Sequence, residues 1–518
     1  MNQPPFAFTG PRPPERFNMA AYVISRAAVA TPDKVALIVH EHLDGPAAEV
    51  WTYRAIEEAV LRIAGGLQAR GLERGDRILI RLDNTSHYAL AFFGAIAAGL
   101  VPLATSTHLS AEEAAFLTSD CGARAVALAD HIRREEVCAG VDIISADDIA
   151  TMLRTAPRAP YAATLADDPA YMVYTSGTTA NPKGVVHAQR AAWGRRPMYS
   201  GWYGITADDR VLHAGAFNWT YTLGTGLTDP WANGATSIIF TGEKAPDIWP
   251  RLMARTNASL FATVPGLYRQ ILKYAPVSDL QQLHALRHGL MAGETPPEGL
   301  FEEWQDATGR PLYEALGMSE ISTYISCSPS SPRKPGTIGK PQPGRSVAIL
   351  PADGGTDPLQ QGETGLLAVH RTDPGLMLGY WKRPEEEAEV LRGDWFIGGD
   401  LAMIDSDGYV THKGRANDIM KALGYRVAPQ EVEAVLATFP GVAEVACAER
   451  RVRAGVSVIA AYVVSRDAAS PPDAAALIAH AQAHLAPYKC PREIVFVASL
   501  PRTANGKVLR RALDKTPD

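Results

Sequence analysis

Helical and strand-like patterns alternate along the first 330 residues, and this alternation limits the chain to a few fold classes. The segment 51–70 carries apolar side chains at helical spacing and stops at Gly71, and the run GDRILIRL at 75–82 is typical of a strand. ATSIIF, DIWPRLMARTN and SLFATVP repeat the pattern between residues 235 and 265. Such alternation is typical of largely parallel sheets in α/β layers. We therefore predict an α/β fold, and 518 residues are enough for two or three domains.

The pattern changes towards the C-terminus. From about Gly336 the sequence has turns every 8 to 12 residues with β-branched runs between them, which predicts a β-rich subdomain. After Lys413, a helix at 429–439, two strands and an Ala-rich helix at 473–486 form a small α+β pattern. We predict a large domain over residues 1–415, β-rich from about 336, and a smaller α+β domain over 416–518.

Composition excludes several classes of protein. Lys and Arg total 50 against 56 Asp and Glu, a net charge of −6, so nothing favours binding to a nucleic-acid backbone. The five cysteines are scattered without a C-x-x-C pair, which argues against a zinc ribbon or a disulfide framework and for the reduced cytosol. The first 20 residues lack the apolar core of a signal peptide, and no apolar run approaches about 18 residues. We expect a cytoplasmic protein with no membrane span and no nucleic-acid partner.

One segment carries strong chemical information. The apolar run AYMVY at 170–174 leads into small hydroxylated residues and glycines, and Pro182, Lys183 and Gly184 follow. Backbone N–H groups and hydroxyls in such a loop can converge on one anion, and Lys183 adds a positive charge suited to phosphate. A polar surface turn is the alternative, but it would not need all these features together. The segment is not a Walker A loop, which requires Gly at 182 and a hydroxyl at 184.

This segment resembles the phosphate-binding signature of the adenylate-forming superfamily, which includes acyl-CoA synthetases, luciferases and peptide-synthetase adenylation domains. Further segments resemble the family's motifs in the same order, from about residue 20 to 512: MAGET at 291–295, YEALGMSE at 313–320, GLLAV at 365–369 with GYW at 379–381, WFIGGD at 395–400, GRANDIMKALGYR at 414–426 and PRTANGK at 501–507. The resemblance implies that the smaller C-terminal domain is mobile, with a hinge near Asn417, where relatives usually carry Asp or Lys.

The resemblance also assigns a role to each motif. A carboxylate is a poor electrophile, so it must attack the α-phosphorus of ATP and become an acyl-adenylate, and positive charge is needed where the anions meet. Lys507 and Lys183 would be catalytic with Glu320, which would also hold Mg²⁺. The other expected ATP and AMP contacts are Thr175, Ser176, Gly177, Thr178, Thr179, Gly293, Glu294, Thr295, Tyr313, Ser319, Asp400 and Arg415. Alternatively, Asp400 could belong to an ordinary turn, Arg415 could be a solvated surface charge, and Lys507 could simply follow a hairpin turn.

Residues 213–226 stand where the family builds its acid pocket. Phe217, Trp219, Tyr221 and Gly224 suit an apolar carboxylic acid, either aromatic or short to medium aliphatic, although the aromatic residues could simply pack a core. The spacing around Tyr221 is similar to that of benzoate-type CoA ligases, whereas Trp219 stands at a position where medium-chain acyl-CoA synthetases also carry tryptophan. Amino-acid activation is disfavoured, because Asn218 stands where peptide-synthetase domains carry an aspartate for the ammonium group.

The acceptor is inferred from the resemblance alone. In relatives, the loop that corresponds to Gly424 and Tyr425 lines the path of the pantetheine chain, and glycine there permits close approach of the backbone. We therefore predict an AMP-forming carboxylate–CoA ligase that uses ATP, Mg²⁺ and CoA. A freestanding acyl-AMP ligase or an adenylation enzyme that loads a carrier protein is the alternative. The expected partners are the small-molecule acid, ATP and CoA, and a homodimer stays open.

Overall fold

The computed structural model describes residues 7–134, 140–175, 182–418, 420–422, 425–427, 429–453, 456–467, 469–502 and 508–513. Contacts divide the chain into two compact units. The first unit comprises Met1–Val347 and Val369–Phe396, and the second comprises Ala348–Ala368 and Ile397–Asp518. Each unit is described by itself.

A mixed sheet in the first unit contains nine strands among the described residues, in the order β15-β14-β13-β12-β11-β9-β10-β1-β2. Its six central strands are parallel, and β2, β14 and β15 run antiparallel to their neighbours at the two edges. The strands are β1 (Val35–His40), β2 (Glu49–Thr52), β9 (Arg210–His213), β10 (Thr236–Phe240), β11 (Leu260–Thr263), β12 (His288–Ala292), β13 (Leu312–Met318), β14 (Ser322–Ser326) and β15 (Lys340–Pro341).

A second sheet of the first unit has seven described strands in the order β18-β8-β7-β4-β3-β5-β6. Here β7, β4, β3, β5 and β6 are parallel, while β8 and β18 are added antiparallel at one edge. The strands are β3 (Arg77–Arg81), β4 (Val101–Ala104), β5 (Ala123–Leu128), β6 (Asp142–Ser145), β7 (Pro169–Thr175), β8 (Lys183–Ala188) and β18 (Gly379–Tyr380). The largely parallel α/β layers expected from the sequence are confirmed.

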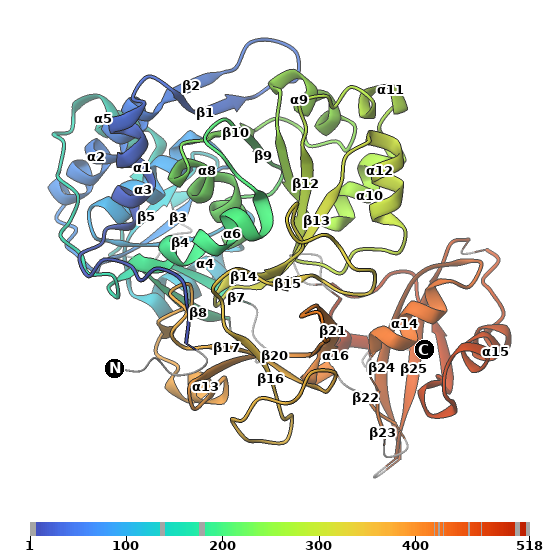
Figure 1. Ribbon diagram of the computed structural model, residues 1–518. Coiled ribbons are helices and arrows are strands. Elements are labelled where there is room, and N and C mark those ends of the chain that lie inside the picture. Colours follow the sequence, from blue (N-terminus) through green and yellow to red (C-terminus); the bar gives the residue numbers. More distant parts are fainter. Residues whose placement is uncertain are drawn as a thin grey trace. The chain divides into compact units, whose positions relative to one another are not determined.

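Helices of the first unit gather around these sheets (Figure 1), α1, α2, α3 and α5 in one group and α9–α12 beside β12 and β13. Their bounds are α1 (Met19–Ala30), α2 (Tyr53–Ala69), α3 (Ser86–Ala97), α4 (Ala111–Cys121), α5 (Ala146–Thr155), α6 (Arg196–Met198), α7 (Thr220–Leu223), α8 (Asp229–Ala232), α9 (Ile248–Thr256), α10 (Pro265–Tyr274), α11 (Val277–Leu280), α12 (Leu300–Thr308) and α13 (Pro384–Glu389). Local sequence explains several ends: Thr52 caps α2, and Ser110 with Glu113 forms a capping box on α4.

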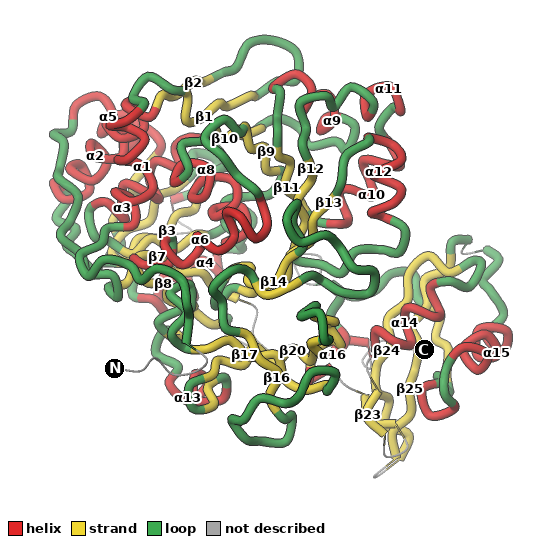
Figure 2. Tube along the Cα trace, viewed as in Figure 1, coloured by secondary structure: helices red, strands yellow, loops and turns green. Residues whose placement is uncertain are grey.

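A β-rich region follows, with its first strand at Val347. Its strands, coloured yellow in Figure 2, are β16 (Val347–Leu350), β17 (Thr364–His370), β19 (Leu391–Arg392), β20 (Trp395–Ile404) and β21 (Val410–Arg415). The last part of the second unit, from residue 416, is α+β: β22 (Met420–Ala422), β23 (Tyr425–Val427), α14 (Pro429–Ala437), β24 (Val442–Arg453), β25 (Val456–Ser465), α15 (Ala474–His484), β26 (Glu493–Phe496) and α16 (Arg510–Leu513). Strands β24, β25 and β26 form one sheet, and a core that includes Val432, Leu436, Ile459 and Leu477 joins α14 and α15 to it.

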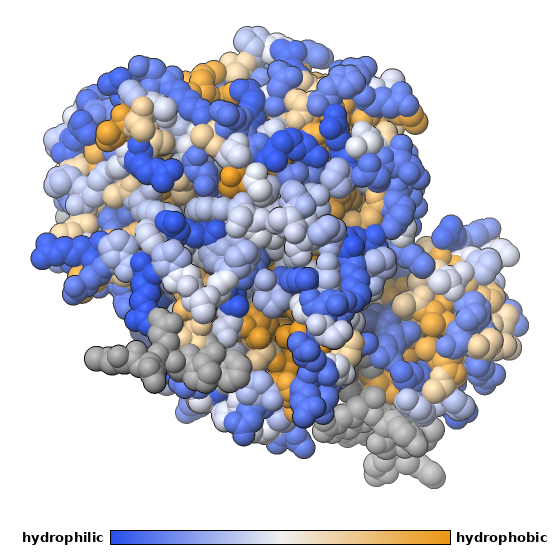
Figure 3. All heavy atoms as spheres, in the orientation of Figure 1, coloured by the Kyte–Doolittle hydropathy of each residue, from blue (hydrophilic) through white to orange (hydrophobic). Residues whose placement is uncertain are grey.

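The surface carries mostly hydrophilic residues on the face seen in Figure 3. Large exposed apolar side chains such as Val29, Val50 and Tyr274 lie on different elements rather than in one patch. Within the described ranges, no helix combines the length and hydrophobicity that crossing a membrane requires.

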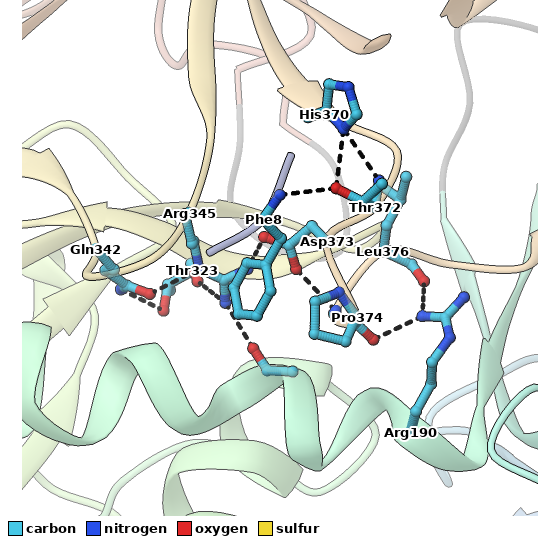
Figure 4. A network of polar contacts seen from close by, with 12 residues as sticks. Phe8, Arg190, Thr323, Gln342, Arg345, His370, Thr372, Asp373, Pro374 and Leu376 are labelled. Carbon is cyan, nitrogen blue, oxygen red and sulfur yellow. Dashed lines mark hydrogen bonds and ion pairs between the residues drawn. The ribbon is translucent and has the colours of Figure 1, made fainter. Parts of the chain in front are cut away.

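A buried polar network fixes the segment that leads into β18 (Figure 4). Arg345 forms an ion pair of 2.7 Å with Asp373, and both side chains are at most 1% exposed. Arg345 also donates to the carbonyl oxygens of Gly194 and Thr323, while Arg190 donates to those of Pro374 and Leu376. Because a buried charge is costly without partners, this network holds the turn in one conformation. The turn is followed directly by the GYW motif.

Candidate functional site

Strands β7 and β8 form an antiparallel hairpin, and the predicted phosphate loop is its connection. Thr175 at the end of β7 pairs with Lys183 at the start of β8, so the backbones on both sides of the loop lie together. Gly184 follows, and a Cβ atom there would lie 2.9 Å from Met172 and 3.0 Å from the Tyr174 ring. Glycine at 184 thus lets the hairpin close against these side chains.

The Lys183 amine lies among charged and aromatic groups of the first unit. It forms an ion pair with Glu386 on α13, and it lies over the ring of Tyr380, 5.2 Å from the ring centroid. Tyr380 reaches this position because β18 pairs with β8, Tyr380 opposite Val185. The Tyr380 hydroxyl donates to Glu320 Oε1 at 2.8 Å. The predicted phosphate lysine and the predicted metal carboxylate are therefore joined through one tyrosine.

The turn after β13 carries Ser319 and Glu320. The Glu320 carbonyl oxygen accepts from the backbone N–H of Met377, and the Ser319 carbonyl oxygen accepts from Nε2 of His187 at 2.8 Å. Burial lowers the pKa of His187 to about 4, so the ring is neutral at pH 7. His187 lies on β8, two strand positions from Val185, and thus couples the hairpin to this turn.

The Glu320 carboxylate fits a magnesium ion. Its oxygens are hard donors, and Mg²⁺ prefers one or two carboxylates completed by phosphate oxygens and water. The parts of the chain that the structure describes hold no group of three or more His, Cys, Asp or Glu side chains placed for a metal. The remaining ligands would therefore come from the nucleotide and from water.

The predicted adenine loop follows β12. Gly293 has a φ of +96°, which favours glycine, and a Cβ atom there would lie only 2.7 Å from Cη2 of Trp219. Glu294 accepts from the backbone N–H of Gly266 at 3.4 Å, and Thr295 is exposed. Half-buried Tyr313 on β13 packs edge-on against His288, with ring centroids 4.9 Å apart. The Trp219 indole thus lies directly on the loop predicted to contact adenine.

The predicted acid-pocket residues occupy three different surroundings. Trp219 and Tyr221 pack edge to face, 5.3 Å between centroids, and the Tyr221 hydroxyl donates to backbone carbonyl oxygens of β11 and β12. Phe217 is 3% exposed and packs against Tyr88 on α3. Gly224 lies against the Arg195 guanidinium, 2.1 Å from where its Cβ atom would be. The structure therefore brings Trp219 to Gly293, with Tyr221 packed on the Trp219 ring, and it places Phe217 and Gly224 against other groups.

Asp400 and Arg415 are paired in the second unit. They lie opposite each other on β20 and β21, and Arg415 Nε is 3.0 Å from Asp400 Oδ1. Nε2 of His412 lies 3.0 Å from the same oxygen, and the Asp400 side chain is 3% exposed. Both basic neighbours contact Oδ1, and a carboxylate offers acceptors of the kind that suit sugar hydroxyls.

Several predicted residues lie outside the described residues: Ser176, Gly177, Thr178, Thr179, Gly424 and Lys507. For Asn417 and Tyr425 the backbone alone is described, in a 3-10 turn and in β23 respectively. Sequence reasoning missed His187 and Glu386 as neighbours of the predicted residues in the first unit, and His412 as a neighbour of Asp400 in the second. His187 and His412 stand at strand positions next to recognised motifs, which is the signal that could have found them.

Comparison with known proteins gives the family. The family model described as AMP-binding enzyme matches residues 24–381, and the model of its C-terminal domain matches 431–507. The chain belongs to the AMP-binding enzymes. It is 31% identical over 478 residues to a 3-hydroxybenzoate–CoA ligase of Aromatoleum sp. (strain CIB), covering 88% of this chain and 90% of the relative.

Solved structures agree. A benzoate CoA ligase from Burkholderia xenovorans LB400 has a TM-score of 0.83 at 30% identity, covering 96% of this chain and 100% of the other. ATP-bound MatB from Rhodopseudomonas palustris has a TM-score of 0.87 at 27% identity, covering 96% and 98%. These likenesses confirm the predicted adenylate-forming superfamily and its fold. The predicted enzyme class is likewise confirmed: an ATP-dependent, AMP-forming acyl-CoA synthetase that uses ATP, Mg²⁺ and CoA, and the carrier-protein alternative is not favoured.

Proposed function

We propose that this acyl-CoA synthetase activates an aromatic carboxylic acid and transfers it to CoA. The observation that carries the proposal is the contact of Trp219 with Gly293, which joins the predicted acid segment to the predicted adenine loop. Trp219 and half-buried Tyr313 border an apolar cluster that includes Tyr221, Leu290 and Ala292, a setting suited to a flat ring. The named relatives that act on benzoate and 3-hydroxybenzoate support the same class.

In the first half-reaction, an oxygen of the carboxylate attacks the α-phosphorus of ATP, the bond to the bridging oxygen breaks, and pyrophosphate leaves. Lys183 and the hydroxyl loop hold the departing phosphates, and Lys507 offsets charge between the carboxylate and the α-phosphate. Glu320, oriented by Tyr380, would hold Mg²⁺, and the ion would supply positive charge against the phosphates. Asp400 accepts from both ribose hydroxyls, with Arg415 on the same sugar.

In the second half-reaction, the CoA thiolate attacks the acyl carbon and AMP leaves with the electron pair of the mixed anhydride bond. We propose that residues 416–518 act as a mobile domain that turns about a hinge near Asn417 between the two steps. Lys507 serves the first step, whereas the loop with Gly424 and Tyr425 serves the second. A rigid-body closure of this kind is a common way to present two surfaces to one site in turn.

A panel of acids tests the substrate class. Release of AMP is measured with benzoate, hydroxybenzoates, and C4 to C8 fatty acids as probes, for the wild type and for Trp219→Ala and Tyr221→Ala. In both variants, kcat/KM for bulkier acids should rise relative to kcat/KM for smaller acids. The KM for ATP should stay nearly constant. Tyr274→Ala, which removes an exposed tyrosine on α10, is the matched control. If both variants keep the parent's acid profile, the two rings are core residues; if fatty acids are preferred throughout, the aromatic class is wrong.

We further propose a cytoplasmic location and a homodimer. The scattered cysteines support a reducing compartment, and all four in the described residues are free and buried. Light scattering on the protein as it elutes from a size-exclusion column measures its mass in solution. A mass of 55.6 kDa, that of one chain, would exclude the dimer.

A further inference from the structure

The predicted phosphate lysine is already neutralised by a carboxylate of its own chain. Lys183 forms its ion pair with Glu386, and the two side chains are only 12% and 23% exposed. An ion pair with so little exposure is screened less by salt than a surface pair. Phosphate that binds Lys183 must therefore compete with Glu386 for the same amine.

The position of Glu386 is fixed by the structure around it. Arg383, one turn earlier in the chain, lies 3.7 Å from Glu386 and donates to Asp120 at 2.9 Å. Asp120 at the end of α4 also accepts from the Tyr174 hydroxyl at 2.6 Å, and its carbonyl oxygen accepts from the Trp381 indole at 3.0 Å. The carboxylate thus stands on a scaffold built from β7, α4 and the GYW segment.

The other acidic residues of α13 do not share this position. Glu385 and Glu389 are exposed, and neither forms an ion pair with another described residue, while Glu387 faces Gly379. Glu385 therefore provides a neighbour of equal charge on the same helix that does not touch the lysine. It is a matched control for removal of one carboxylate.

We propose that Glu386 is the resident counter-ion of Lys183, which the β- and γ-phosphates of ATP displace when they bind. The proposal rests on the phosphate-binding role proposed above for Lys183. Before binding, the pair holds the amine over the ring of Tyr380, whose hydroxyl donates to Glu320. When pyrophosphate leaves, the lysine returns to Glu386, so the pair weakens retention of the product. Glu386 is a positioning residue because it acts through Lys183 and touches no substrate.

The test is the pair of variants Glu386→Gln and Glu385→Gln in ATP–pyrophosphate exchange and in inhibition by added pyrophosphate. Loss of a competing ion pair worth up to about 1 kcal/mol should lower KM for ATP and Ki for pyrophosphate about fivefold in Glu386→Gln. Glu385→Gln should match the wild type, and KM for the acid should stay unchanged in both. A merely structural role would instead alter the acid and nucleotide constants together.

Glu386→Asp is a second variant that keeps the charge but shortens the side chain. Its constants should lie between those of the wild type and Glu386→Gln, and it remains informative if the amide variant folds poorly. Constants for ATP and pyrophosphate that are unchanged or raised in Glu386→Gln and Glu386→Asp would overturn the counter-ion role. A wild type that exchanges pyrophosphate with no acid would instead overturn the proposed function.

Discussion

Substitution of Gly293 by alanine perturbs the contact between the predicted acid segment and the predicted adenine loop with a single methyl group. The backbone φ at Gly293 is +96°, and the new Cβ atom would lie 2.7 Å from Cη2 and 3.1 Å from Cζ2 of Trp219. Ordinary contacts of this kind begin at 3.4 Å, so the indole must move by several tenths of an ångström. The substitution therefore adds backbone strain and a steric clash at one position.

Two terms give the expected magnitude. Left-handed backbone costs an alanine about 1–2 kcal/mol, and overpacking adds about 1–3 kcal/mol. Gly309 separates the terms, because its φ is +69° and nothing lies within 4 Å of the position of its Cβ atom. Gly309→Ala should therefore lose only about 1–2 kcal/mol of unfolding free energy, whereas Gly293→Ala should lose about 2–5 kcal/mol.

Urea denaturation of Gly293→Ala, Gly309→Ala, Trp219→Ala and the Gly293→Ala/Trp219→Ala double variant measures these losses. In the double variant the clash is gone, so the cost of the alanine should fall to that found at Gly309. The displaced indole should also raise KM for the acid in Gly293→Ala but not in Gly309→Ala. Equal losses at the two glycines, or additive losses in the double variant, would refute the reasoning.

Three further outcomes are expected. Asp229→Asn leaves buried Arg195 without its counter-ion and should lower the free energy of unfolding by about 3–5 kcal/mol in urea denaturation. Asp33→Asn, in the exposed pair with Arg54, should lower it little. Since His187 has a folded pKa of about 4 and an ordinary value of about 6.5, its stabilising contribution is present above pH 6.5 and is lost as the pH falls. By urea denaturation, the free energy of unfolding at pH 5 should be about 2 kcal/mol lower than at pH 7 because of this histidine, and His187→Asn should remove that part of the pH dependence. Lys507→Ala should lose adenylation by about two to four orders of magnitude but still convert a supplied acyl-adenylate to thioester, and Gly424→Leu should do the reverse; equal damage to both steps would contradict the two-conformation scheme.

Local patterns in the sequence predicted the elements well. Apolar spacing with the stop at Gly71 predicted α2, the run GDRILIRL predicted β3, and turn spacing predicted the β-rich part, because these features depend on residues close together in the chain. The family could be recognised because each of its motifs is itself a short local segment, and the motifs follow one another in the expected order. The site's contacts were harder to predict: nothing in a sequence says that Glu386 meets Lys183, since that pairing depends on how β18 joins β8.

The residues predicted to form the acid pocket show what the sequence could not predict. Phe217, Trp219, Tyr221 and Gly224 follow one another within eight positions, yet the short helix α7 and the π-helical turn Gly224–Thr228 send them in different directions. Phe217 packs on α3, and Gly224 makes room for Arg195. These partners come from segments more than 25 residues away, so tertiary packing, not local pattern, decides which side chains meet.

The central claim is that this chain joins an aromatic acid to CoA through an acyl-adenylate. The most direct measurement follows AMP, pyrophosphate and free thiol together, with benzoate or a hydroxybenzoate, ATP and Mg²⁺, in the presence and absence of CoA. We predict one AMP and one pyrophosphate for each thiol consumed, and pyrophosphate exchange without CoA. ADP as the product, or turnover only with amino acids and a carrier protein, would contradict the account.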